Sequence, residues 1–349
     1  MKIDYSKVNK KDIEQLLLDK NMNIAAADAL FEFSFYSGNH PINHKDYSKA
    51  ILEFLELNLD DREDKYFFDT RIIPSVKELD SKDYDDNWYR KNICPKEYKS
   101  NNYQLTYLTF KPYQCFPYND VKVDDDYIEV SQIGYFSKPF SYLAVLKDDV
   151  VWMSTDPNEL NTMKQPIRDA KGHVLAFGLG LGYFSLMTAL KEETKDVTII
   201  EYDPEIISIF KKHILPLFPY KEKIHIVEGD AFEFTRKNNL KDYDYLFIDI
   251  WHNAEDGLPM YLRFKRLLKD KNIKVSYWLE KSILAMYRRC LLTIIEENMK
   301  GYKKDRYLQA KNDYDKIVND LYFKTENMVF RSISEIKEIL QDNNLEKLI

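Results

Sequence analysis

Four short segments of this chain hold residues whose types and spacing can do chemistry. Each is an apolar run that ends in glycine or in a carboxylate. Glycine lacks the side chain that would keep a ligand away from backbone N–H groups, and carboxylates accept hydrogen bonds from hydroxyl and amino groups. One run is followed by a histidine, which titrates near neutrality and can move a proton. Together they predict a site for a nucleoside-type ligand with a group-transfer reaction beside it.

The first segment is a glycine turn, in which Gly178, Gly180 and Gly182 alternate with leucines after the apolar run 174–177. A helix-compatible stretch follows, so the turn presents backbone N–H groups at the positive end of a helix. We expect these glycines and Tyr183 to contact the ligand.

Three other interpretations of the glycine turn compete with ligand binding. Residues 172–190 hold no Asp, Glu, Lys or Arg and approach the ~20 residues of a membrane span, although three glycines and charged flanks argue against one. A turn of the NAD type would place its third glycine one residue later. Glycines here can also serve only close packing of a helix on a strand.

The second and third segments supply carboxylates for a nucleoside. Glu201 ends an apolar run 19 residues after Gly182, the spacing at which an acid binds ribose hydroxyls, and Tyr202 adjoins it. Asp203 precedes a proline and is better explained as a helix N-cap. Asp230, followed by Ala231, can accept the amino group of adenine or cap a helix, and we expect both roles.

The fourth segment is where a transferred group would meet its acceptor. Its run ends at Asp249, which can bind the amino group of a cofactor or orient His252, the candidate general base. Further residues are expected in the substrate pocket, with Tyr183 as an additional wall: Trp251, Asn253 and Glu255. The structural alternatives are a core aromatic for Trp251 and a loop residue without a role for His252.

Composition limits the class of protein. The net charge is −7 with 31% charged residues, which favours a small cationic or neutral substrate and leaves nucleic acid as the weaker alternative. Three widely spaced cysteines and an N-terminus without an apolar stretch predict a reduced, cytoplasmic protein with no membrane partner. No metal-ligand spacing stands out, so no metal is expected.

The surrounding elements divide the chain into four predicted parts. Residues 1–103 read as a helical region, loop-rich from 61, and residues 104–155 as a small antiparallel β domain. Residues 156–280 alternate strands with helices, which predicts a doubly wound, parallel α/β sheet of the Rossmann-like type. Residues 281–349 read as a helical extension, for which a homodimer interface is one role. The expected strands of this sheet are 173–178, 197–201, 224–228, 244–249 and 273–278, with a helix at 258–268 before the last of them. Outside the sheet we expect separate helical faces at 13–18 and 25–35, a strand at 127–133 and a helix at 305–323.

The segment from about 150 to 280 resembles class I S-adenosylmethionine (SAM)-dependent methyltransferases, and among them the spermidine synthase-like (polyamine synthase) branch. The matching stretches are Val174–Gly182, Ile200–Pro204, Val227–Ala231 and Tyr245–Asp249. The resemblance implies SAM as cofactor. It departs from the polyamine synthases at His252, which stands where their catalytic acid would be, and at the end of the sheet, which lacks the usual last strands.

Three functions remain open from the sequence. The first is a SAM-dependent methyltransferase with a small-molecule acceptor. The second is an aminopropyltransferase that uses decarboxylated SAM, with Asp249, Glu255 and Asp256 holding a polycation. The third is a non-catalytic SAM-binding protein. A site for SAM needs donors for its carboxylate, whereas a site for decarboxylated SAM does not.

Overall fold

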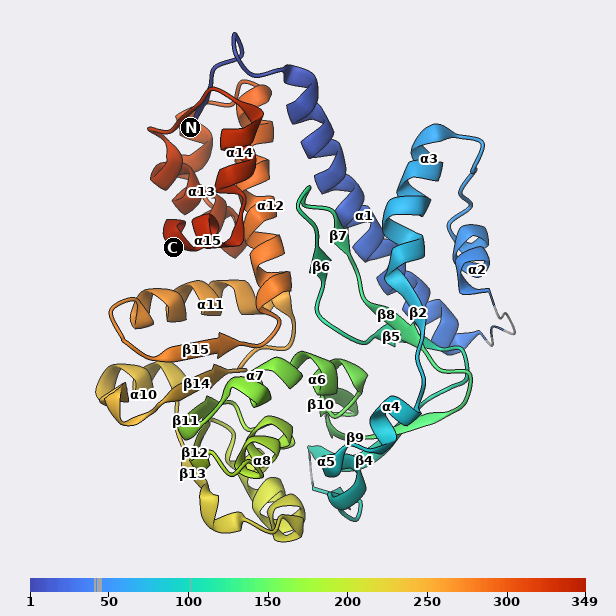
Figure 1. Cartoon of the computed structure of the whole chain (residues 1–349), viewed down its shortest axis with the longest axis vertical. Coiled ribbons are helices and arrows are strands. Elements are labelled where there is room, and N and C mark those ends of the chain that lie inside the picture. Colours follow the sequence, from blue (N-terminus) through green and yellow to red (C-terminus); the bar gives the residue numbers. More distant parts are fainter. Residues whose placement is uncertain (41, 43–45, 101) are drawn as a thin grey trace.

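The computed structural model describes residues 1–40, 42, 46–100 and 102–349. Figure 1 shows an α/β domain, a group of small sheets, a C-terminal group of helices and one long N-terminal helix that reaches between them. The predicted α/β class is confirmed. Among the described residues, no helix is both long and apolar enough to cross a membrane.

The α/β domain is built on five parallel strands in the order β13-β12-β11-β14-β15. Their bounds are β11 (Gly172–Phe177), β12 (Thr194–Glu201), β13 (Ile224–Glu228), β14 (Tyr245–Ile248) and β15 (Lys274–Tyr277). Runs such as Leu246–Ile248 are buried on both faces, as parallel strands between helices require. Among the described residues no further strand joins after β15, in agreement with the shortened sheet predicted from the sequence.

Helices connect these strands with short loops, as the sequence predicts. They are α8 (Tyr183–Ala189), α9 (Pro204–Ile209), α10 (Ala231–Lys237) and α11 (Ala254–Leu268), while α6 (Pro157–Thr162) and α7 (Lys164–Asp169) lead into β11. One prediction was wrong: α11 begins four residues before the expected residue 258. Asn253 and Asp256 form a reciprocal capping box that starts the helix ahead of Pro259.

The N-terminal region differs from its prediction in two ways. The two helical faces expected before residue 36 belong to one helix, α1 (Lys10–Asn39), because no proline or glycine interrupts the sequence before Gly38. The loop-rich stretch after residue 61 is mostly ordered. It holds α3 (Arg62–Phe67), α4 (Lys82–Asp85), α5 (Trp88–Asn92), short turns of other helix types over 68–75, and β2 (Val76–Glu78); α2 (Tyr47–Phe54) precedes it.

The small β domain contains antiparallel pairs as expected, but it is several sheets rather than one. The four-stranded sheet has the order β10-β9-β4-β3, with β3 (Tyr98–Lys99), β4 (Tyr103–Phe110), β9 (Phe140–Lys147) and β10 (Val150–Ser154). The expected strand at 127–133 is instead β7 (Glu129–Val130) and β8 (Ile133–Tyr135), which pair in different sheets. β7 joins β6 (Lys122–Val123), and β8 joins β5 (Cys115–Pro117) and, in parallel, β2.

The C-terminal extension is helical, with α12 (Glu280–Met299), α13 (Asp313–Thr325), α14 (Ile333–Ile339) and α15 (Asp342–Leu345). The helix predicted from 305 begins only at Asp313, because Asn312 caps it and 304–308 form a 3₁₀ turn. The two ends of the chain meet here: β1 (Lys2–Ile3) pairs in parallel with β16 (Val329–Phe330).

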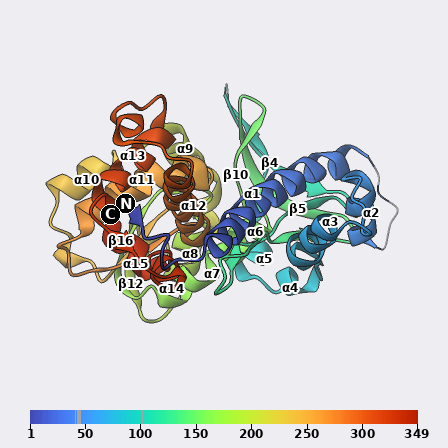
Figure 2. The same ribbon diagram turned by 90° about the horizontal axis from the view of Figure 1, so that it is seen from above.

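Contacts between distant segments hold the parts together across the predicted boundaries at residues 103 and 280. Lys20 of α1 forms an ion pair of 2.6 Å with Glu296 of α12. Asp120, from the loop before β6, accepts the backbone N–H groups of Lys281 and Ser282 and so caps α12. Figure 2 shows α1 crossing from the C-terminal helices to the small sheets.

Candidate functional site

A cavity of about 650 Å³ lies where strands β11, β12, β13 and β14 end. Ligands of open α/β sheets bind at this edge, next to the point where the strand order reverses, here between β11 and β14. Helix α6 and the hairpin of β9 and β10 complete the lining. The parallel sheet thus brings together side chains from four segments that are far apart in the sequence.

The glycine turn has the backbone that only glycine adopts easily. Gly178, Gly180 and Gly182 have φ values of 95°, 52° and 76°. A Cβ on Gly180 would meet nothing within 4 Å, and this residue lines the cavity. Gly182 does not line it: a Cβ there would lie 2.2 Å from the ring of Phe210. Gly182 therefore serves helix packing, the alternative weighed for this turn, whereas Gly178 and Gly180 face the cavity.

Glu201 connects the ends of two strands. Its Oε2 accepts the Leu179 N–H at 2.9 Å, and its Oε1 accepts the Asp203 N–H at 2.8 Å. The carboxylate is fixed at the cavity edge, and each oxygen keeps a second lone pair for a ligand hydroxyl. Tyr202 is 76% exposed and lines the same edge.

The third strand end combines a cap with a cavity position, as predicted. Asp230 Oδ1 accepts the Glu233 N–H at 2.7 Å and so caps α10. Asp230 and Ala231 both line the cavity. Asp203 also has the expected role, because its carboxylate accepts the N–H groups of Glu205 and Ile206 at the start of α9.

Two carboxyl groups of the lining, those of Asp249 and Glu159, have no ion-pair partner among the described residues. Burial, together with the negative charge of Glu201, raises the pKa of Asp249 to about 7. Burial and the neighbouring Asp249 and Asp156 carboxyls raise the pKa of Glu159 well above its usual range. Sequence reasoning missed Glu159. The signal that identifies it is an N-cap before a proline, Asp156, followed by Glu159 and Met163 at the spacing of one helix face.

Asp249→Asn is expected to stabilise the ligand-free protein at alkaline pH. A carboxyl whose pKa rises from 3.8 to about 7 on folding keeps its proton in the folded chain while the unfolded chain ionises. The contribution of Asp249 to the free energy of unfolding is therefore most favourable below about pH 4. It falls as the pH rises toward about 7 and stays reduced above that. We expect the free energy of unfolding of D249N to exceed that of wild type by about 2 kcal/mol at about pH 8. This is less than the whole pKa shift would give, because water enters the cavity.

Urea unfolding across this pH range measures the effect. The control is Glu228→Gln, which changes an exposed carboxylate that ends β13 outside the cavity lining. If the free energy of unfolding depended on pH equally in wild type and D249N, the prediction would be wrong.

His252 lies at the rim of the cavity, and its orienting partner differs from the one expected. Its Nδ1 lies 2.9 Å from Asp256 Oδ2, and its ring centroid lies 4.3 Å from that of Trp152. Among the described residues, no hydrogen bond joins His252 to Asp249. The capping box explains the difference, because it places Asp256 one helical turn from His252. A histidine held through Nδ1 by a carboxylate has the arrangement of a general base.

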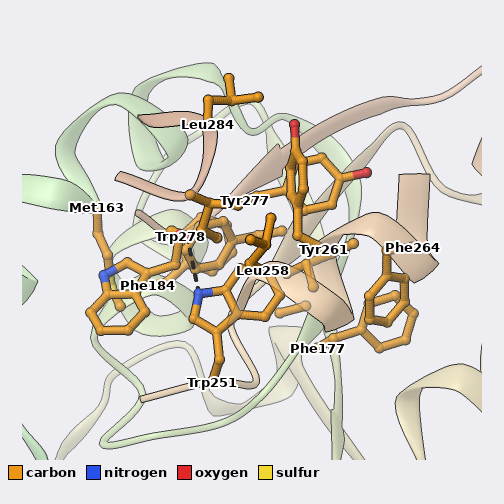
Figure 3. Packing of buried hydrophobic residues seen from close by; sticks show 14 of the residues in the cluster. Met163, Phe177, Phe184, Trp251, Leu258, Tyr261, Phe264, Tyr277, Trp278 and Leu284 are labelled. Carbon is orange, nitrogen blue, oxygen red and sulfur yellow. Dashed lines mark hydrogen bonds between the residues drawn. The ribbon is translucent and has the colours of Figure 1, made fainter. Parts of the chain in front are cut away.

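The neighbours of His252 divide between core and surface. Trp251 is 5% exposed, lines the cavity, and donates its indole N–H to the Trp278 carbonyl at 3.1 Å, as Figure 3 shows. It is both a core aromatic and a cavity wall. Asn253 and Glu255 do not line the cavity: Asn253 caps α11, and Glu255 is exposed in its first turn. Their predicted substrate contacts therefore have no counterpart in this geometry.

The N-terminal region supports the glycine turn from outside. Tyr183 lines the cavity, and its hydroxyl accepts a hydrogen bond of 2.9 Å from Asn87. Tyr89 donates to the Leu181 carbonyl at 2.5 Å. Helix α5 and its N-cap residue thus hold the turn through contacts between distant segments that no local sequence signal indicates.

The lining is rich in acidic side chains, and a cation that enters would favour their ionised forms. Six carboxylate residues contribute: Asp156, Glu159, Glu201, Asp203, Asp230 and Asp249. Among the residues in the described ranges, only Lys147 adds a lysine or arginine to this lining, and its Nζ lies 3.7 Å from Asp203. None of the other five carboxylates forms an ion pair with a described residue. The cavity is therefore suited to a cation. Within the described ranges, no three His, Cys, Asp or Glu residues are grouped to hold a metal ion.

No protein-family model and no curated protein matches the chain. Distant structural matches include TrmK of M. capricolum with S-adenosyl-homocysteine, at 17% identity and a TM-score of 0.26, covering 33% of this chain and 48% of that one. Spermidine synthase from Thermotoga maritima matches at 16% identity and a TM-score of 0.31, over 43% and 58%. A spermidine synthase in complex with the transition state analogue AdoDATO matches at 15% identity and a TM-score of 0.32, covering 43% of this chain and 58% of that one.

The matched region thus spans about half the length of these solved structures. The resemblance expected from the sequence is confirmed as a distant structural match to SAM-dependent methyltransferases and spermidine synthase. At these identities and TM-scores, nothing about ligand or reaction follows from the likeness.

Proposed function

We propose that the protein is a SAM-dependent methyltransferase that acts on a small amine. The observation that carries the proposal is the cavity lining: a glycine turn, a fixed carboxylate at Glu201, and further carboxylates without cationic partners. Bound SAM supplies an activated methyl group on a sulfonium, which a nucleophile can accept. A cavity with this charge favours such a cation.

The chain's own residues fit the ligand. Gly180 leaves room for it, Glu201 can accept two ribose hydroxyls, and Asp230 can accept the amino group of adenine with its second oxygen. Asp249 can bind the ligand's amino group. His252, oriented by Asp256, can take the proton that the acceptor amine loses. Tyr183 and Trp251 can form walls of the space in which the methyl group is transferred.

Aminopropyl transfer from decarboxylated SAM is the second candidate, and one observation favours it. Lys147 is already paired with Asp203, so the carboxylate of SAM meets no unengaged lysine or arginine among the described lining residues. A ligand without that carboxylate would avoid repulsion from the six acids.

Calorimetry with SAM, S-adenosylhomocysteine and decarboxylated SAM tests both candidates. Micromolar binding of the first two supports methyl transfer, and clear preference for the third supports aminopropyl transfer. Absence of binding by all three would overturn both. Formation of S-adenosylhomocysteine from SAM with a panel of amines then tests turnover.

A further inference from the structure

Strand β10 departs from regular alternation at Trp152. Its register with β9 shifts between Val151 and Met153. Successive side chains of a regular strand point to opposite faces, yet the four consecutive residues 151–154 all line the cavity. A β-bulge redirects side chains in this way and often lies beside an active site. The bulge turns this edge-strand segment toward the cavity.

The hairpin of β9 and β10 spans the cavity mouth from the end of β12 to the end of β14. On one side, Lys147 lies 3.7 Å from Asp203 and 4.5 Å from the Trp152 ring. On the other side, the Trp152 ring lies 4.3 Å from that of His252. The tight turn between the strands has positive φ at Asp148 and Asp149, as a two-residue hairpin requires. Trp152 is thus held between a lysine and a histidine at the rim.

The inner lining near this hairpin combines one free carboxyl with apolar side chains. Glu159 accepts no hydrogen bond through its side chain from any described residue. The same lining includes thioether and indole side chains: Met153, Met163, Met260, Trp251 and Trp278. Trp278 is fixed by an indole hydrogen bond of 2.9 Å to Thr162 of α6, so this wall is preformed. Figure 3 shows Met163, Trp251 and Trp278 in this packed group.

We propose that the space bounded by Trp152, His252 and Glu159 is the acceptor subsite, and that it selects an amine with one ammonium group on an aromatic or other apolar body. The inference rests on the proposed function for the assignment of the remaining cavity to the adenosyl ligand. Glu159 pairs with the ammonium, and the methionine and tryptophan side chains cover the body. A second ammonium placed beside Trp152 would meet the ammonium of Lys147, which lies 4.5 Å from that ring, so a polycation is disfavoured.

Trp152 is the specificity-determining residue of this subsite. The test measures the binding of phenethylamine, putrescine and phenethyl alcohol by calorimetry to the whole protein saturated with S-adenosylhomocysteine. We expect phenethylamine to bind at least about tenfold more tightly than the other two, since each lacks either the apolar body or the charge. Trp152→Leu should weaken the binding of phenethylamine about tenfold, and Trp152→Phe should retain most of the wild-type affinity.

The matched control is Val150→Ala, which changes a residue of the same strand that is 68% exposed and outside the lining. It should leave amine binding unchanged. Unaltered binding of S-adenosylhomocysteine by W152L shows that the variant is folded. Putrescine binding as tight as phenethylamine binding, or an unchanged affinity in W152L, would overturn the inference.

A preliminary titration with S-adenosylhomocysteine alone separates the two proposals. If that ligand does not bind while phenethylamine does, the proposed function fails and the amine subsite stands. If it binds and no amine does, the subsite fails and the cofactor assignment stands. If neither binds, both are wrong.

Discussion

Glu201→Ala is expected to weaken the binding of SAM and S-adenosylhomocysteine at least about 100-fold, because charge-assisted hydrogen bonds to two hydroxyl groups are lost together. The loss has a second cause within the protein. The Leu179 and Asp203 N–H groups, which donate to this carboxylate, lose their acceptor, and a side-chain contact between the ends of β11 and β12 is lost. Calorimetry with both ligands measures the effect.

Two variants separate ligand contact from loop support. Glu201→Gln keeps one acceptor oxygen and should lose about tenfold in affinity. Glu228→Ala removes the carboxylate that lies opposite Glu201 in the pairing of β12 with β13, is exposed, and should bind as wild type does. Wild-type affinity in Glu201→Ala would remove this residue from the ligand site.

Gly178→Ala is expected to destabilise the fold by about 4 kcal/mol or more, which is exceptional for one methyl group. A Cβ at this position would lie 1.9 Å from the backbone oxygen of Asp249. That oxygen belongs to the end of β14, so β11 and β14 would have to separate where their last residues pair. The φ of 95° adds strain for any residue with a side chain. Urea unfolding monitored by circular dichroism gives the free energy.

Gly301→Ala is the control for Gly178→Ala, because it isolates backbone strain from steric conflict. Its φ is 77°, and a Cβ there would meet nothing within 4 Å. We expect a loss of only about 1 kcal/mol from this change. Similar losses of unfolding free energy in both variants would mean that the steric conflict with Asp249 does not cause the effect of Gly178→Ala.

Much of the α/β domain could be predicted from sequence because its signals are local. Apolar runs of strand length mark β11 to β15, and caps such as Asp203 and Asp230 mark the helices between them. The errors occur where a distant contact or a neighbouring cap overrides the local pattern. The capping box of Asn253 moves the start of α11, and the residues around 127–135 divide between two sheets because their partners lie elsewhere in the chain.

The candidate site divides in the same way. The residues at strand ends, such as Glu201 and Asp249, were predictable because parallel strands bring their carboxyl ends to one edge. Lys147 and Trp152 were not, since a different part of the chain carries them over that edge. The bulge at Trp152 depends on how β10 pairs with β9, and a single strand sequence does not specify it.

The pairing of β1 with β16 has a consequence for biosynthesis. Residues 2 and 3 can complete their ladder only after residues 329 and 330 have been made. Helix α1 likewise waits for α12, its partner through Lys20 and Glu296, while Ile13, Leu16 and Leu17 remain without their final cover. The nascent chain therefore carries α1 with an uncovered apolar face until α12 has been made, and we expect a chaperone that binds exposed apolar segments to hold it during that time.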